Sequence, residues 1–169
     1  TLAVVDFRVF VEPQQGAGYS DQLAVARTAE SLGYSAFFRS DHFLAFGTDG
    51  HPGPTDAWVT LGALARETST IRLGAGGVML PNHSPLTIAE QFGTLEAAHP
   101  GRIDLGLGRA PGTDQLTARA LRGPATSPGA DDFPEALADL FGWLHGGHES
   151  VALDLATAAG RAHLAALVD

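Results

Sequence analysis

Apolar, strand-like segments that end abruptly in polar or glycine residues constrain the fold of this chain more than any other feature. The segment AFFR (36–39) is followed by the tripeptide SDH (40–42). IRLGAGGVML (71–80) runs into a polar turn, and RIDLGLG (102–108) runs into Arg109. Strands with acids, imidazoles and glycines at their carboxyl ends are typical of α/β barrels, where these ends line a ligand site. The three segments therefore predict one shared site.

Helical patterns separate these strand-like segments along the chain. Ser20, Asp56 and Ser84 each stand where a helix would begin, and Pro85 suits a first helical position. Gly33 is typical of a helix end. The predicted strands are 2–11, 36–39, 71–78 and 103–108, and the predicted helices are 21–32, 56–66, 84–98, 113–122, 134–144 and 150–168. Strands that alternate with helices of this length indicate βαβ units and a parallel sheet.

The number of predicted strands is smaller than a closed barrel needs. A (β/α)8 barrel has eight strands and about 250 residues, whereas this chain has 169 residues and shows no strand-like segment after Gly108. The predicted fold class is therefore α/β, a partial (β/α)8 barrel of about four parallel strands with flanking helices. We expect a single domain, made of a half-barrel region over 1–122, a linker over 123–133 and a C-terminal helical segment over 134–169.

The composition excludes several classes of function. The chain has no cysteine and no lysine, because all ten of its basic residues are arginine. This excludes disulfides, cysteine-ligated metals, lysine Schiff bases and the lysine of a P-loop. A net charge of −9 argues against nucleic-acid binding, and the apolar segments are shorter than the ~20 residues of a membrane helix. We expect a cytoplasmic protein without a metal that acts on a small molecule.

Several motifs resemble one enzyme family. Resemblance to the deazaflavin-using luciferase-like oxidoreductases rests on FRVFVEPQQGAGYSD (7–21), AFFRSDHFLAFG (36–47), GPTDAW (53–58) and LARETSTIRLG (64–74). From Gly74 onward, GAGGVMLPNHSPLTIAEQFGTLEAAHPGRIDLGLGRAPGTDQLTARALR resembles the branch of the same family that uses flavin mononucleotide, FMN. The resemblance implies a (β/α)8 barrel of about twice this length. The chain resembles the N-terminal half of such a barrel.

The glycine-rich end of the third predicted strand is the predicted site for the cofactor ring. Gly74, Ala75, Gly76 and Gly77 are small enough for a planar ring to approach the backbone. In the family that the chain resembles, this place holds a bulge with a cis non-prolyl peptide bond. By position that bond would join Ala75 to Gly76, at a cost of ~3 kcal/mol. The alternative is that the glycines only permit close packing of helix and strand.

A possible acid–base group follows the second predicted strand. His42 can donate or accept a proton beside the ring, and Asp41 can hold this imidazole in one tautomer or bind the polar edge of the ring. The resemblance implies that the SDH motif lies at the cofactor, with the histidine as acid or base. The alternative is that Asp41 caps a turn and His42 only begins a loop.

Other polar groups are predicted to contact the cofactor. Gly108 and Arg109 end the fourth predicted strand, and a guanidinium there can grip the cofactor phosphate. The alternative is an exposed arginine that pairs with Asp114. Asn82 and His83 precede a helix, whose N-terminus favours an anion, and are predicted at the rim of the pocket. The alternative is that Asn82 and His83 only form a loop, whose Ser84 caps the helix that follows.

Three functional interpretations follow. The first is an oxidoreductase or monooxygenase that uses reduced FMN or a deazaflavin coenzyme on a small organic substrate. The second is a non-catalytic module that binds flavin or another protein. The third is a truncated half-barrel without activity of its own. Because an unfinished barrel leaves exposed strand edges and an open apolar face, we also expect a homo-oligomer or a partner that completes the barrel.

Overall fold

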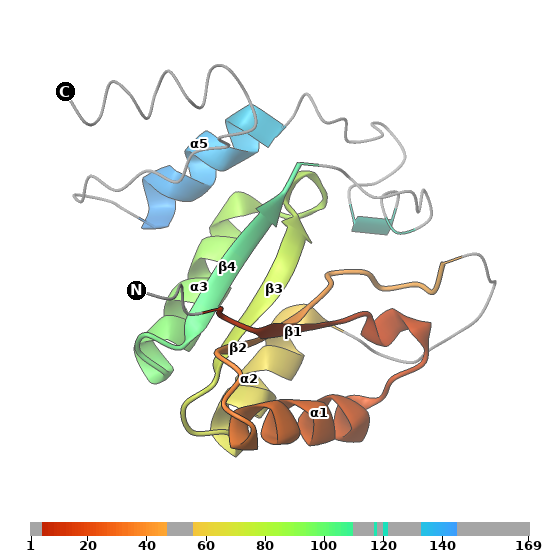
Figure 1. Ribbon diagram of the computed structural model, residues 1–169. Coiled ribbons are helices and arrows are strands. Elements are labelled where there is room, and N and C mark those ends of the chain that lie inside the picture. Colours follow the sequence, from red (N-terminus) through yellow and green to blue (C-terminus); the bar gives the residue numbers. More distant parts are fainter. Residues whose placement is uncertain (1–4, 47–55, 110–116, 118–119, 122–132, 145–169) are drawn as a thin grey trace.

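Residues 5–46, 56–109, 117, 120–121 and 133–144 are described by the computed structural model shown in Figure 1. The strands are β1 (Arg8–Val11), β2 (Ala36–Arg39), β3 (Arg72–Met79) and β4 (Ile103–Gly108), and the helices are α1 (Tyr19–Ser31), α2 (Ala57–Glu67), α3 (Pro85–Ala98) and α5 (Phe133–Leu144). Short 3-10 turns η1 (Pro13–Gln15) and η2 (Leu80–Asn82) follow β1 and β3. The strands form one parallel sheet in the order β1-β2-β3-β4. The predicted α/β fold with four parallel strands is confirmed.

Local signals account for the helix ends. Asp56 caps α2 by accepting a hydrogen bond of 2.8 Å from a backbone N–H of its first turn. Gly33, with φ of 78°, follows the last turn of α1, as predicted. The prediction that Ser20 caps α1 was wrong, because the helix already begins at the preceding residue. Its first turn is closed instead by Asp21, which accepts a hydrogen bond of 2.8 Å from the backbone N–H of Gly18.

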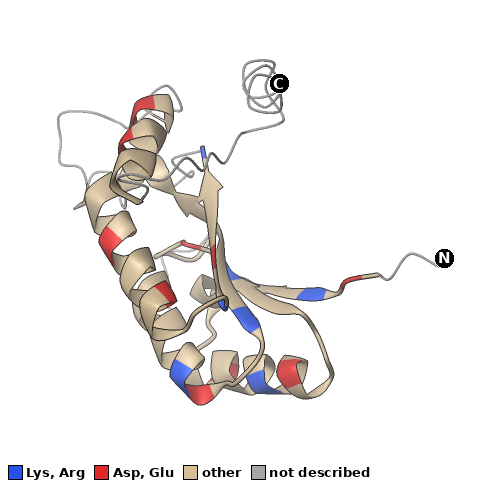
Figure 2. Ribbon diagram, turned by 90° about the vertical axis from the view of Figure 1, so that its left-hand side faces the viewer, with Lys and Arg blue, Asp and Glu red and all other residues tan. Residues whose placement is uncertain are grey.

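The two faces of the sheet carry different side chains. Outer-face residues such as Phe37, Leu73 and Ile103 are buried against the helices and form the core. Figure 2 shows the helices along one side of the curved sheet. Strand alternation and register place on the opposite, inner face Arg8, Phe10, Ala36, Phe38, Arg72, Gly74, Gly76, Asp104 and Gly106. Phe10 is 51% exposed, so the described residues leave the inner face open.

A β-bulge interrupts the pairing of β3 with β4. The register passes from Gly76 opposite Gly106 to Val78 opposite Leu107, which leaves Gly77 as the extra residue. Gly77 has φ of 109°, a conformation that glycine adopts at little cost. The predicted bulge is therefore present. The predicted cis bond before Gly76 was wrong, since the described residues contain no cis peptide bond and the turn of the backbone is made at Gly77.

The loop that leads into β3 is held from two sides. Glu30 on α1 accepts hydrogen bonds of 2.6–3.0 Å from the backbone N–H groups of residues 69–71. Arg102 donates to the backbone carbonyls of Ala65 and Thr68 at 3.1 Å and to that of Ile71 at 3.2 Å. These contacts fix the starting point of β3 against α1 and α2, and so set where its carboxyl end lies.

Helix α5 lies in the outer layer beside α3. It packs against α3 and η2, and Phe133, Ala136 and Leu140 are buried in the common core. No helix in the described ranges is long and apolar enough to cross a membrane. The linker predicted over 123–133 falls, apart from its last residue, outside the described residues, as do the helix over 150–168 and most of the helix over 113–122.

Candidate functional site

Asp41 joins the carboxyl ends of two strands. It lies two residues beyond β2, and only 4% of its surface is exposed. Its Oδ2 atom accepts a hydrogen bond of 3.1 Å from the backbone N–H of Met79, the last residue of β3. The same oxygen lies 2.7 Å from Nε2 of His83. One buried carboxylate therefore holds the end of β3 and the turn that follows it.

The imidazole bound by Asp41 is that of His83. The sequence predicted that Asp41 would hold His42 in one tautomer or bind the polar edge of the ring. The structure shows a hydrogen bond between Asp41 and the histidine 42 positions further along the chain. The side chain of His83 is 15% exposed, and its backbone N–H is fixed by a 3.0 Å hydrogen bond to the carbonyl of Leu80. His42 instead packs its ring edge-to-face against Phe46, with ring centroids 4.5 Å apart. The two histidines thus have different surroundings at the same end of the sheet.

A buried polar network surrounds the two residues that precede Asp41 in the chain. Arg39 is fully buried at the end of β2. Its guanidinium donates a hydrogen bond of 2.9 Å to the backbone carbonyl of Ser40 and one of 3.2 Å to the backbone carbonyl of Asp56. Burial lowers the pKa of Arg39, and the nearby charges of Asp41 and Asp56 partly oppose this. The hydroxyl of Ser40 donates a hydrogen bond of 2.7 Å to Oε1 of Gln14 in η1. Sequence reasoning missed this network, although a charged residue on the apolar side of a strand was its signal.

The glycines of the predicted ring site divide into two groups. At Gly74 an added Cβ atom would lie 2.6 Å from the Phe38 ring and 2.7 Å from the Asp104 carbonyl oxygen, so this glycine permits close packing. At Gly76 an added Cβ atom would meet mainly the ring of Phe10, at 2.4 Å. Phe10 is half exposed and able to move, and no atom lies within 4 Å of the corresponding position at Gly77.

The remaining predicted cofactor residues lie along the same carboxyl edge. Ala75 is fully buried with its side chain in the core, so only its backbone can face a ligand. Asn82 is 3% exposed in η2. Gly108 pairs with Met79 at the end of β4, and Arg109 follows it with an exposed side chain. The structure thus places Asp41, Gly77, Asn82 and Arg109 at one end of the sheet.

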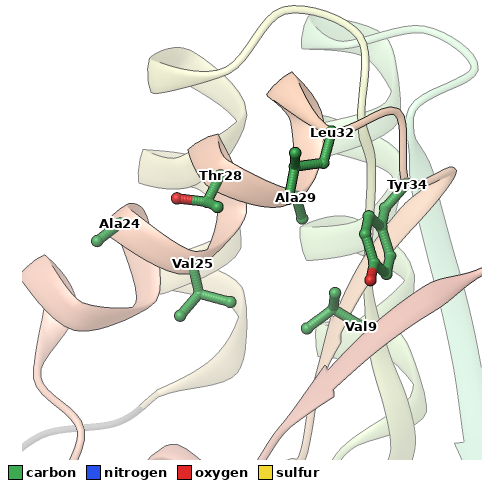
Figure 3. Close-up of a pocket in the computed structure, with 7 residues that line it drawn as sticks. All are labelled: Val9, Ala24, Val25, Thr28, Ala29, Leu32 and Tyr34. Carbon is green, nitrogen blue, oxygen red and sulfur yellow. The ribbon is translucent and has the colours of Figure 1, made fainter.

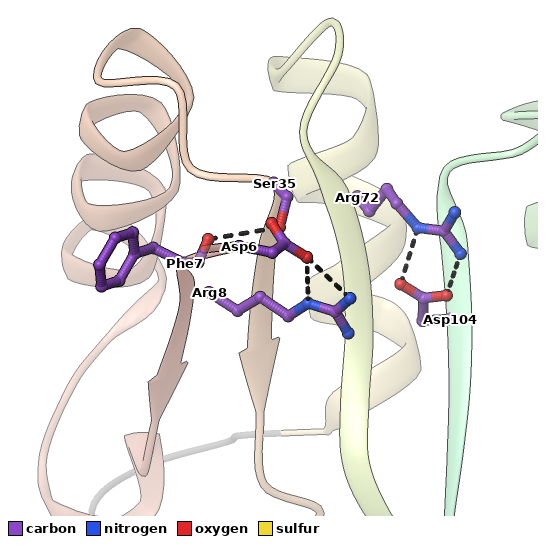
Figure 4. Close-up of polar contacts among 6 residues, drawn as sticks. All are labelled: Asp6, Phe7, Arg8, Ser35, Arg72 and Asp104. Atoms are coloured by element: carbon purple, nitrogen blue, oxygen red, sulfur yellow. Dashed lines mark hydrogen bonds and ion pairs between the residues drawn. The ribbon is translucent and has the colours of Figure 1, made fainter. Parts of the chain in front are cut away.

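Ion pairs occupy the opposite, amino-terminal end of the inner face. Arg72 on β3 pairs with Asp104 on β4, and its Nε lies 3.0 Å from the carboxylate (Figure 4). The hydrogen bond to Asp104 raises the pKa of Arg72. Arg8 on β1 pairs with Asp6 at 2.9 Å (Figure 4). Because each of these two arginines has an acidic partner, this end of the inner face is locally neutral.

Comparison with known proteins identifies the family. The family model for luciferase-like monooxygenases matches residues 2–160. The chain therefore belongs to the luciferase-like monooxygenase family. It is 50% identical over 125 residues to the luciferase-like monooxygenase of Escherichia coli K12. The aligned residues make up 74% of this chain and 36% of that protein. It is 39% identical over 140 residues to the N-acetyl-S-alkylcysteine monooxygenase of Bacillus subtilis, 82% of this chain and 40% of the relative.

Solved structures have the same fold. Apo-MsnO8 superposes with a TM-score of 0.67 at 34% identity, over 85% of this chain and 45% of MsnO8. Two neighbours at lower identity share the fold and carry a cofactor. An F420-dependent secondary alcohol dehydrogenase bound to an F420-acetone adduct has a TM-score of 0.69 at 20% identity, covering 88% of this chain and 44% of its own. The oxygenating constituent of 3,6-diketocamphane monooxygenase from Pseudomonas putida, bound to FMN, has a TM-score of 0.65 at 19% identity. The match covers 80% of this chain and 38% of that protein.

The length of the match is the chief difference from these proteins. The chain spans about a third of the length of the curated relatives it matches and less than half of the solved chains. Solved neighbours bind FMN or coenzyme F420, as the resemblance implied. The four-stranded sheet thus corresponds to part of a luciferase-like barrel.

Proposed function

We propose that this chain is the part of a luciferase-like oxidoreductase that holds the ring of FMN or a deazaflavin coenzyme such as F420, and that the enzyme acts on a small organic molecule. The observation that carries the proposal is the double contact of Asp41 with the backbone of Met79 and with His83. These contacts fix the bulge at Gly77 within the carboxyl edge of the sheet, where barrel enzymes carry their sites.

The surface around the bulge fits a flat ring. The inner face of β3 carries no side chain at Gly76 or Gly77, and the ring that covers Gly76 belongs to the half-exposed Phe10. A rotation of this phenylalanine side chain would bare the backbone for a planar ligand. Reduced FMN or F420 would supply hydride or electron transfer when bound. The chain itself contributes the flat backbone wall and excludes water from one side of the ring.

Two polar side chains have separate roles in this proposal. His42 lies just beyond β2 and would donate or accept a proton at the substrate or at the ring. Arg109 would bind the cofactor phosphate, because an exposed guanidinium at a strand end offers paired N–H donors. Asp41 and His83 act through the backbone that they fix and are positioning residues. The later strands of the longer relatives would add further contacts.

Binding titrations test the proposal. The 169-residue protein is titrated separately with FMN and with F420 under reducing, oxygen-free conditions, and cofactor fluorescence is followed. We expect saturable binding of one cofactor, and about tenfold weaker binding by Gly76→Ala, because the new methyl group would stand on the backbone wall that the planar ring would contact. Gly93→Ala is the matched control, since its Cβ atom would enter open space on α3.

Three outcomes distinguish the interpretations. Binding with turnover of an aldehyde or alcohol supports the oxidoreductase. Binding without turnover of any substrate supports a non-catalytic flavin module. Failure to bind either cofactor, in a protein with native circular dichroism, contradicts the proposed ring site.

A further inference from the structure

We propose that Gln14 is a positioning residue of the candidate site, which holds the carboxylate of Glu12 toward a bound substrate at the carboxyl end of β1. Gln14 is fully buried in η1. Its Nε2 atom donates a hydrogen bond to Oε2 of Glu12, and its Oε1 atom accepts one of 2.7 Å from the hydroxyl of Ser40. The three side chains form a relay that joins the carboxyl ends of β1 and β2. The inference rests on the proposed function, because it adds a group to the same site and names the kind of substrate that this group binds.

The chemistry of the three side chains gives the relay one direction. An ionised carboxylate only accepts hydrogen bonds, so the amide of Gln14 must turn its NH2 group toward Glu12. The carbonyl oxygen of the same amide then faces Ser40, whose hydroxyl is able to donate. Within the described residues the carboxylate of Glu12 accepts no other hydrogen bond. The relay therefore fixes Oε2 of Glu12 and leaves Oε1 to a ligand.

The geometry of the sheet places Glu12 on the inner face, in line with the proposed ring site. Val9 lines the groove of about 330 Å³ between β1 and α1, on the outer side of the sheet (Figure 3). Side chains alternate along a strand, so Glu12 follows Phe10 on the inner side. One position beyond the last pairs of the register, residue 12 stands beside Ser40, and Ser40 beside Gly76. With about 5 Å between neighbouring strands, the backbone of residue 12 lies roughly 10 Å from the bare backbone at Gly76.

The turn at η1 does not need either polar side chain for its own stability. Glu12 immediately precedes η1, but its side chain does not cap the turn. The backbone closes the turn by itself, since the N–H of Gly16 donates a hydrogen bond of 3.0 Å to the carbonyl of Pro13. An apolar side chain would fill the buried place of Gln14 without the cost of burying an amide. A buried amide that packing does not require, bonded to an acid at the edge of the site, supports a positioning role.

A carboxylate held in this way selects its substrate by charge and by hydrogen bonding. It accepts a hydrogen bond from an O–H or N–H group and repels another anion. The substrate class is therefore a neutral or cationic molecule that carries such a donor, for example an alcohol. Arg109, which would bind the cofactor phosphate, follows β4 at the other side of the four-stranded sheet. Three strand spacings, roughly 14 Å along the sheet, separate the cation for the phosphate from the carboxylate for the substrate.

Nuclear magnetic resonance tests the relay in the absence of a cofactor. The side-chain amide signals of Gln14 are followed in the 15N-labelled 169-residue protein while the pH is lowered from about 7 to about 4, where carboxylates begin to take up protons. We expect these signals to shift, because Nε2 of Gln14 donates to Glu12. The shift should vanish in Glu12→Gln and persist in Glu90→Gln, a matched control at an exposed glutamate of α3. A shift that is absent in the wild type, or unchanged in Glu12→Gln, overturns the proposal.

Two probes of equal length and different charge, hexan-1-ol and hexanoate, test the contact with substrate. Each is added to the protein alone and to the protein with its cofactor, and its dissociation constant is measured from the backbone amide signal of Gly76. We expect the alcohol to bind more tightly than the anion, and Glu12→Gln to reduce this preference by about tenfold or more. Gln14→Met keeps the shape of the side chain without its amide, and Ser40→Ala removes the donor to that amide. Both should reduce the preference to a smaller extent, whereas Gln15→Ala, at the exposed neighbour in η1, should not change it.

The outcomes separate this inference from the proposed ring site. An equal preference in the wild type and in Glu12→Gln overturns the contact with substrate. An unchanged preference in both Gln14→Met and Ser40→Ala overturns the positioning role. Because the probes are also measured without a cofactor, a wild type that keeps the preference for the alcohol but binds neither FMN nor F420 contradicts the ring site alone.

Discussion

Replacing Glu30 by glutamine measures how firmly the amino-terminal end of β3 is held. Burial of the Glu30 carboxylate raises its pKa, but hydrogen bonds from the backbone of Thr70, Ile71 and Ser69 and from the Thr70 hydroxyl outweigh this effect and lower the pKa from 4.5 to about 2. Glutamine keeps an acceptor oxygen but loses the charge that these donors stabilise.

The pKa change sets the size of the expected effect. A difference of 2.5 pKa units corresponds to at most about 3.4 kcal/mol, at 1.36 kcal/mol per unit. The Glu30 side chain is partly exposed, and solvent screening reduces this value. We therefore expect Glu30→Gln to lower the free energy of unfolding by about 1–2 kcal/mol at pH 7.

Urea unfolding at a series of pH values, at one fixed protein concentration, tests this expectation. The folded-state pKa lies below the unfolded value, so the contribution of Glu30 is complete above about pH 4.5 and is lost as the pH falls toward about 2. The difference between wild type and variant must shrink over that range. Glu90→Gln, at an exposed glutamate of α3, is the control. A difference that is absent at pH 7, or that stays constant down to pH 2, refutes the reasoning.

Three further predictions concern the site and the sheet. Gly106→Ala should destabilise the protein strongly in thermal unfolding, because its Cβ atom would lie 2.5 Å from a backbone oxygen of β3, whereas Gly93→Ala should not. His83→Ala should weaken cofactor binding and increase amide exchange at Met79, which reports on the bulge; unchanged exchange would contradict a positioning role. In steady-state kinetics His42→Ala should lower kcat by roughly 10²–10⁴-fold with little change in cofactor affinity, whereas Arg109→Ala should weaken cofactor affinity by roughly 10–100-fold.

The sequence alone predicted the strands and helices of the described residues, except that the first strand, predicted over 2–11, is only Arg8–Val11, and residues 5–7 before it are not strand. The helices that begin after Asp56 and Ser84 and the strands 36–39 and 103–108 lie where the sequence placed them. Turn residues, caps and apolar periodicity are local signals, and they report directly on local structure. The family was also evident from the motifs, since a long segment such as the one that begins at Gly74 is specific to it.

The tertiary structure alone decided which residues meet. Asp41 is hydrogen-bonded to His83, 42 positions further along the chain, because the register of β2 against β3 brings the η2 turn to the end of β2. The glycines of β3 look equivalent in the sequence, yet Gly74 is needed for packing, whereas Gly77 absorbs the bulge. Such distinctions depend on which strand lies alongside which and at what offset. Periodicity along one segment carries no information about that offset, because it is fixed by contacts between residues far apart in the chain.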